Sequence, residues 1–192
     1  MKKPMSTTRL EAFSDGVIAI IITIMVLELK VPHELNAEAL DQLQPIGLSY
    51  VLSFFTVAIM WINHHHMLHL ADRATTSLLW LNTHLLFWMS LIPFSTDLLA
   101  EGHGNPAAAC IYGINLAACS IAFIPLHDEV ARQDGEAPGK RRARLLIEGM
   151  SVVAYIAGAA LAFASRYAAY AVFALVPVVY FVRSFLLHKT VD

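Results

Sequence analysis

The sequence predicts an all-α protein that crosses a membrane six times as a single domain of 192 residues. Hydrophobic residues make up 57% of the chain and charged residues only 15%, whereas soluble domains carry about 25% charged residues. The apolar residues are concentrated in six long blocks. These blocks are too long and too uniformly apolar for the alternating strands of a membrane barrel, so each is expected to be a helix.

The first span is expected over about residues 8–31, closed by Pro32. Its largely apolar run from Gly16 to Leu27 would be roughly 18 Å long as a helix, which is shorter than a bilayer core of about 30 Å. The same helix must therefore carry the preceding polar residues to the headgroup level or below. These residues are Arg9, Glu11, Ser14 and Asp15. Because such groups usually face a bundle interior or a watery cavity, we expect this helix to do more than anchor the chain.

The other five spans are expected at about 46–68, 77–99, 107–126, 145–165 and 167–187. Pro45 is taken as a helix-start signal for the second span, because proline is favoured in the first turn of a helix. Pro93 is expected to kink or end the third helix. The polar segment 128–144 contains two glycines and a proline, so we expect it to be a mobile loop.

The distribution of positive charge predicts that both termini lie in the cytoplasm. With six spans, one side of the membrane holds both termini and the loops 69–76 and 127–144. All of the 13 Lys and Arg residues lie on that side except Lys30 and Arg166. Because positively charged loops stay in the cytoplasm, the sequence predicts a multi-pass protein of the inner cell membrane with that side inward.

One stripe of the first span is a candidate pore wall. Gly16, Ile20, Thr23 and Leu27 follow one another at helical spacing and so share one face. Thr23 is the only polar side chain within the apolar run. Such a stripe could line a narrow pore, or it could pack against another helix while the threonine hydroxyl bonds to a carbonyl of the preceding turn. Periodicity alone favours packing.

The polar residues of the first span need partners from other helices. Arg9 and Asp15 lie on different faces of a regular helix, so they would not pair with each other, and an unpaired buried charge is costly. The second span supplies Asn63 and the run His64–His66, and the third supplies Asn82 at a matching depth. We therefore expect a polar network at the cytoplasmic end of the bundle.

The histidines of the second span also suggest a metal site. His65 and His69 are four residues apart, and His66 and His69 are three apart, so either pair could share a helix face. His84 in the third span is a possible third ligand. The sequence contains no HExxH motif and no cysteine near these positions, so we expect no bound metal. Two alternatives stay open: metal transport by this cluster, and proton conduction through Asp15 and the histidines.

Several classes of function leave no motif in the sequence. It contains no GxSxG, no Walker-type glycine loop and no paired carboxylates on one helix face, so no enzyme is expected. It has no basic tract typical of nucleic-acid binding and no potassium-filter sequence of the TVGYG type. The extracytoplasmic loops are short and offer no obvious pore loop.

Three segments of the first half resemble a known family. The pattern Arg-x-x-x-Phe-Ser-Asp, formed by Arg9, Phe13, Ser14 and Asp15, resembles the signature of the endosomal and lysosomal potassium channel family. The segments 61–65 and 90–94 resemble that family's pattern at the corresponding places. The resemblance covers roughly residues 7–100, and the second half matches mainly in topology and length.

The resemblance implies a potassium-preferring cation channel. Prokaryotic members are six-span chains that assemble as homotetramers around one central pore, lined by the first helix and lacking a pore loop. A single stripe cannot enclose a path, so rotational repetition of the chain is required in any case. The expected partners are monovalent cations, membrane lipid and other copies of the chain, with potassium as the permeant ion and no cofactor.

The same resemblance assigns roles to individual residues. Ile20 and Leu27 would form hydrophobic rings, Thr23 would form a hydroxyl ring, and Ile24 would lie beside them. Hydrophobic rings gate by dewetting, and hydroxyls can replace part of an ion's water shell. The signature residues would join an interhelical polar network near the cytoplasmic mouth with a histidine of the second span, either His64 or His65.

Overall fold

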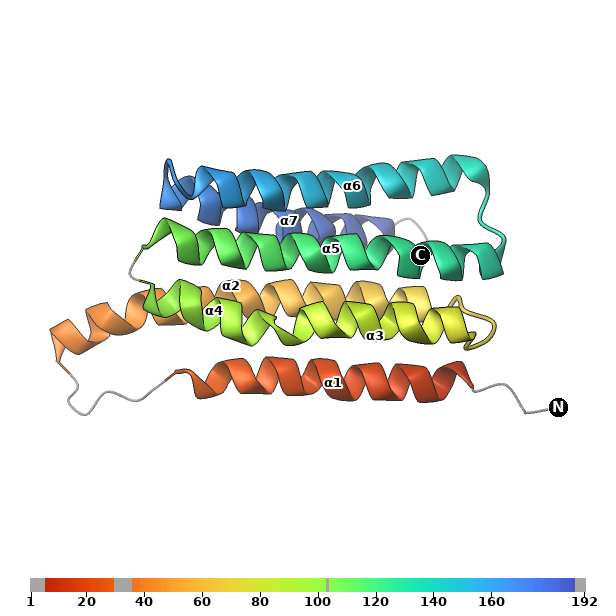
Figure 1. The fold of residues 1–192 in the computed structure, drawn as a ribbon, viewed down its shortest axis with the longest axis horizontal. Helices are drawn as coiled ribbons and strands as arrows, with labels where there is room; N and C mark the ends of the chain where they lie inside the picture. The colour runs from red at the N-terminus through yellow and green to blue at the C-terminus, as the bar shows by residue number, and fades with distance from the viewer. Residues whose placement is uncertain (1–5, 30–35, 103, 189–192) are drawn as a thin grey trace.

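The computed structural model describes residues 6–29, 36–102 and 104–188 of the chain (Figure 1). Six helical spans in these residues are long and apolar enough to cross a membrane, and α3 and α4 together form one of them. This confirms the all-α, six-span prediction. The helices are α1 (Thr7–Leu27), α2 (Ala37–Leu68), α3 (Thr76–Ser90), α4 (Ile92–Glu101), α5 (Pro106–Asp134), α6 (Pro138–Leu161) and α7 (Arg166–His188).

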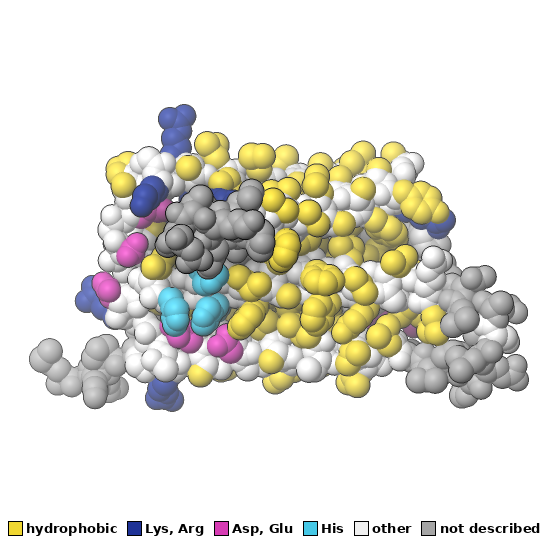
Figure 2. All heavy atoms as spheres, turned by 180° about the vertical axis from the view of Figure 1, so that it is seen from behind, with side chains coloured by type: hydrophobic (Ala, Val, Ile, Leu, Met, Phe, Trp, Pro, Cys, Tyr) yellow, Lys and Arg dark blue, Asp and Glu magenta, His cyan; other side chains and the backbone are white. Residues whose placement is uncertain are grey.

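The helices run side by side along the long axis of the molecule (Figure 1). The start of α1, the α2–α3 turn and the α5–α6 turn lie together at one end, which we call the N-terminal end. Figure 2 shows hydrophobic side chains over the middle of one face, with Lys, Arg, Asp, Glu and His side chains gathered toward this end. The segments expected to be cytoplasmic therefore share one end of the bundle.

The start of the second helix differs from the prediction. α2 begins at Ala37, so Pro45 lies inside the helix and not at its start. Proline removes one backbone hydrogen bond and crowds the preceding turn. Here its side chain is exposed, and the apolar span Leu43–Leu68 continues through it. The first helix ends at Leu27, earlier than residue 31, and Pro32 lies outside the described residues.

The expected break near Pro93 occurs at Leu91. α3 ends at Ser90, and Pro93 occupies the first turn of α4, where its missing N–H is not needed. The hydroxyls of Ser95 and Thr96 both donate hydrogen bonds to the carbonyl of Ile92, at 3.1 and 2.7 Å. The third span is thus two short helices joined end to end.

The expectation of a mobile loop over 128–144 is wrong. α5 continues to Asp134 and α6 begins at Pro138, so only residues 135–137 connect them. Gly135 has a φ of 72° and ends α5 in the left-handed conformation, and Pro138 lies in the first turn of α6. The glycine and proline therefore act as a helix stop and a helix start. The fourth and fifth spans are correspondingly longer than predicted toward this turn.

The position of α1 is set by its neighbours. It packs against α2, α3 and α4, and Figure 1 shows it at one edge of the bundle. α5 lies among the other helices and supplies some of the largest fully buried side chains, including Tyr112, Leu116 and Leu126. One side of α1 is consequently covered by no described part of its own chain.

Candidate functional site

The two faces of α1 have different surroundings. Its buried stripe consists of Leu10, Ser14, Ile18, Ile21 and Met25. The stripe singled out from the sequence lies on the other side: Ile20 is 58% exposed, Ile24 42% and Leu27 73%. Gly16 and Thr23 are also exposed, and a Cβ atom on Gly16 would meet nothing within 4 Å. The candidate pore wall is therefore not a packing face within the chain.

The hydroxyl of Thr23 is held by its own helix. Thr23 Oγ1 donates to the carbonyl of Ile20 at 2.9 Å, as expected for a threonine bonding to the preceding turn. The hydrogen is then directed at the backbone, and the oxygen lone pairs remain available as acceptors. On the exposed face, this arrangement offers oxygen to a cation or a water molecule.

Three buried side chains form a hydrogen-bonded chain behind α1. His64 of α2 contacts Asn82 of α3 with an Nε2–Oδ1 distance of 2.7 Å, and the Nδ2 of Asn82 donates to Ser14 Oγ at 2.9 Å. Ser14 Oγ in turn donates to the carbonyl of Leu10 at 2.9 Å. Because Asn82 Oδ1 can only accept, the histidine must donate through Nε2. We call Ser14, Asn82 and His64 the polar foot of α1.

A second contact involves the carboxylate of the signature. The indole N–H of Trp61 donates to Asp15 Oδ1 at 2.8 Å, and the Trp61 ring stacks on His65 with centroids 5.8 Å apart. The imidazole of His69 follows, with its centroid 4.6 Å from that of His65 and its Nδ1 3.6 Å from Glu11. The contacts of Trp61 with Asp15 and of His69 with Glu11 therefore connect α1 to α2 and the residue that follows it.

Not all residues expected in the polar network lie in it. His65 stacks beside Trp61 and is not bonded to Asn82. The side chains of Arg9 and Phe13 are exposed, and Arg9 forms no ion pair within the described part of the chain. Asn63 lines a cavity on another side of α2. In a single copy of the chain, the foot thus joins Ser14, His64 and Asn82 but leaves Arg9 and Phe13 facing outward.

Sequence reasoning missed Trp61 as the partner of Asp15. A tryptophan near the end of a membrane helix commonly anchors the chain at the membrane interface. The signal was the indole N–H, because this donor usually finds an acceptor when the ring is partly buried.

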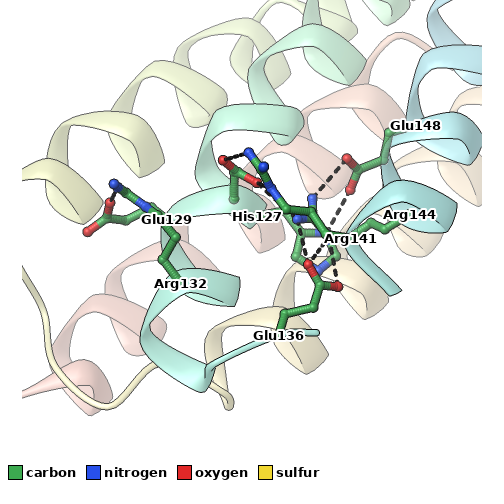
Figure 3. A network of polar contacts seen from close by, with 8 residues as sticks. His127, Glu129, Arg132, Glu136, Arg141, Arg144 and Glu148 are labelled. Atoms are coloured by element: carbon green, nitrogen blue, oxygen red, sulfur yellow. Dashed lines mark hydrogen bonds and ion pairs between the residues drawn. The ribbon is translucent and has the colours of Figure 1, made fainter. Parts of the chain in front are cut away.

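A cluster of ion pairs around the α5–α6 turn was also missed (Figure 3). The side chain of Arg144 is only 10% exposed and pairs with Asp128 at 3.1 Å, Glu136 at 2.9 Å and Glu148 at 3.2 Å. His127 Nδ1 lies 2.7 Å from Glu148 Oε1. The hydrogen bond from Arg144 is the main reason that the pKa of Glu136 is lowered. The i, i+4 spacing of Arg144 and Glu148 was the available signal.

The histidine cluster does not gather into a metal site. Within the described residues, no group of three or more His, Cys, Asp or Glu side chains is placed to hold a metal ion. His84 instead accepts a hydrogen bond from the indole of Trp88 at 3.0 Å. His65 and His69 stack with each other, and His69 faces Glu11.

The chain is similar to one family of membrane channels. The family model "Endosomal/lysosomal potassium channel TMEM175" matches residues 9–93. A potassium channel of Chryseobacterium sp. is 39% identical over 188 residues, covering 97% of this chain and 98% of its own. A potassium channel of Chamaesiphon minutus is 39% identical over 137 residues, covering 67% of this chain and 68% of its own.

A solved structure matches most of the fold. The crystal structure of a lysosomal potassium-selective channel TMEM175 homolog from Chamaesiphon minutus superposes with a TM-score of 0.80. It is 32% identical, and the match covers 93% of this chain and 97% of that one. The similarity thus extends beyond residues 9–93 into the second half of the bundle.

Proposed function

The chain belongs to the endosomal/lysosomal potassium channel TMEM175 family and is a multi-pass cation channel of the cell membrane, and from this premise we propose that it prefers potassium and conducts through a pore lined by α1. The pore would lie on the axis of a homotetramer. The Chryseobacterium and Chamaesiphon relatives, both named potassium channels, support the choice of ion.

The observation that carries this proposal is the uncovered face of α1. A helix that spans the membrane at the edge of the bundle, with an apolar stripe and one hydroxyl facing away from its own chain, is suited to meet its symmetry mates. Closed rotational symmetry would repeat the stripe around an axis. Four copies would enclose a path, with Gly16 at one end of the stripe and Leu27 at the other.

Each residue of the stripe has a proposed role. Ile20 and Leu27 form hydrophobic rings that close the path by excluding water, with Ile24 beside them as part of the wall. Thr23 forms a ring of hydroxyl oxygens between them. Oxygen ligands replace part of the water shell of a permeating ion, and potassium gives up its water more readily than sodium. A hydroxyl ring of this kind therefore favours potassium.

The polar foot is proposed to fix the rotation of α1 about its own axis. Ser14 lies on the buried stripe, so its hydrogen bond to Asn82 sets which face of the helix points away. Asp15, held by Trp61, adds a second attachment. Arg9 and Phe13 are exposed in one chain, and we propose that they contact neighbouring copies near the mouth of the pore. The mouth would be cytoplasmic, as both termini are expected to be.

The test measures potassium and sodium flux into liposomes that contain the protein, and it compares substitutions of two threonines. Thr23→Ala is expected to lower the potassium-to-sodium permeability ratio. Thr83→Ala is the matched control, because Thr83 is also exposed and donates to its own helix, to the carbonyl of Leu79 at 2.9 Å, but lies on α3. An unchanged ratio in Thr23→Ala, or an equal change in both variants, would remove Thr23 as a selectivity residue.

A further inference from the structure

A second feature of the bundle lies away from α1. A cavity of about 550 Å³ opens between α2, α5, α6 and α7. None of its lining residues belongs to α1, so it is separate from the proposed pore. Its volume is within the range of about 300–1,000 Å³ that is typical of small-molecule sites.

The lining of the cavity changes from charged to apolar along its length. One face of α6 lines the cavity along its length with residues at helical spacing: Lys140, Arg144, Ile147, Ser151 and Tyr155. These positions span roughly 22 Å of helix. Lys140 lies at the N-terminal end of the bundle and Tyr155 lies toward its middle. The cavity thus has a charged mouth and an apolar interior.

The apolar interior is built from three other helices. Ile59 and Met60 come from α2, Phe123 from α5, and Val176 and Pro177 from α7. Between the interior and the mouth, the hydroxyls of Ser151 and Tyr180 lie 3.0 Å apart and both line the cavity. From the mouth inward, the wall therefore presents charged groups, then hydroxyl groups, then hydrocarbon side chains.

The mouth carries unbalanced positive charge. Both carboxylates that line it, Glu136 and Glu148, are bonded to Arg144. Lys140 and Arg183 line it as well, and neither forms an ion pair with any residue that the structure describes. Three cations and two carboxylates thus line the mouth, an excess of one positive charge, and Lys140 and Arg183 remain available to an anion.

We propose that this cavity binds an anionic phospholipid, with the phosphate between Lys140 and Arg183 and one acyl chain along the apolar interior. Basic pockets between membrane helices on the cytoplasmic side bind anionic headgroups, and the cytoplasmic leaflet supplies such lipids. The sequence of charge, hydroxyl and hydrocarbon matches the phosphate, ester and acyl regions of a phospholipid. Free phosphate would satisfy the cations but leave the apolar interior without a partner.

Lipid retention tests the headgroup contact without reference to conduction. The full-length protein is taken from vesicles of phosphatidylglycerol or phosphatidylcholine into detergent, and retained lipid is counted by native mass spectrometry. The double variant Lys140→Gln/Arg183→Gln is expected to bind phosphatidylglycerol about thirtyfold more weakly than the unmodified protein. Arg142→Gln, an exposed basic residue of α6 that does not line the cavity, is expected to leave retention unchanged.

A second pair of variants tests the acyl-chain contact. Ile147→Trp would narrow the cavity beside the proposed acyl chain and is expected to reduce retention of phosphatidylglycerol. Leu146→Trp is the control, because Leu146 is 60% exposed and faces away from the cavity lining. Equal retention of the two lipids, equal retention in both tryptophan variants, or displacement of the lipid by inorganic phosphate alone would overturn the proposal. The readout is bound lipid, so failure here leaves the proposed pore unaffected.

Discussion

Asn82 donates its side-chain amide to the hydroxyl of Ser14 at 2.9 Å, across 68 positions of sequence. The bond joins the middle of α3 to the buried stripe of α1. A rotation of α1 by one residue would turn that stripe by about 100° and break the bond. The orientation of the exposed stripe therefore depends on a contact made on the opposite face of the same helix.

Removing the amide should destabilise the bundle and disturb selectivity together. Asn82→Leu keeps the approximate size of the side chain but leaves the buried His64 without its partner, while Ser14 keeps only its bond to the carbonyl of Leu10. Each buried unsatisfied group costs about 1–3 kcal/mol, so the melting temperature should fall clearly. Asn63→Leu, at a half-buried residue of α2, should have a smaller effect. If Asn82→Leu melts lower but keeps its permeability ratio, the foot stabilises α1 without orienting it.

The hydrophobic rings should control leak. Ile20→Ser places a hydroxyl where the proposed gate excludes water, so potassium flux in liposomes is expected to rise several-fold. Ile114→Ser on α5 changes a side chain of similar exposure, 55% against 58%. Equal flux in the two variants would mean that Ile20 does not constrict the path.

The oligomer should contain four copies, with α1 on the axis. Native mass spectrometry is expected to give a mass four times the 21.2 kDa of one chain. In a background without Cys110 and Cys119, Leu27→Cys should form disulfide-linked dimers under mild oxidation, because a disulfide needs two Cα atoms within about 7 Å. Leu175→Cys on α7 is also exposed and should not cross-link. A dimer mass, or cross-linking only at position 175, would contradict the arrangement.

The α5–α6 ion pairs should make stability depend on acid. The pKa of Glu136 is lowered by Arg144, so its contribution is present at neutral pH and is lost as pH falls below the usual range for glutamate. Arg144→Gln should therefore lower the melting temperature at pH 7 and flatten its decline as the pH falls below about 4.5. Arg142→Gln, an exposed residue of α6 with no ion pair among the described residues, should do much less. An identical pH profile in both variants would show that Arg144 is not the dominant partner.

Two glycines of α6 should respond oppositely to alanine. A Cβ on Gly158 would lie 2.5 Å from Phe173 Cε1, whereas a Cβ on Gly149 would meet nothing within 4 Å. Gly158→Ala should destabilise the protein by about 1–3 kcal/mol through overpacking. Gly149→Ala should be neutral or stabilise it by up to about 1 kcal/mol, since alanine favours the helix. Thermal unfolding in detergent distinguishes the two.

Features set by local hydropathy could be predicted from the sequence. The six spans follow from apolar blocks, and the short apolar run of the first helix indicated that Ser14 and Asp15 need partners, which in the structure are Asn82 and Trp61. Periodicity found the stripe of Ile20, Thr23 and Leu27 but could not say which face of α1 is buried. That choice depends on Asn82 and His64, which belong to other helices.

Features that depend on tertiary contacts could not be predicted. Glycine and proline, here Gly135 and Pro138, are common both in flexible loops and in tight turns between helices, so their presence does not distinguish the two. Several charged residues of 128–144 pair with one another across the turn, with Arg144 bonded to both Asp128 and Glu136. The cavity walls come from four helices, and no local pattern places Lys140 of α6 and Arg183 of α7 on the same cavity.

The tight turn at residues 135–137 has a mechanical consequence. α5 has 29 residues and is therefore roughly 43 Å long, which exceeds the bilayer core of about 30 Å. The ion pairs of Arg144 join the last turns of α5 to the first turns of α6 as one stiff unit. A flexible linker at this place would instead absorb displacement. A force applied to this turn would travel along α5 to the opposite side of the membrane.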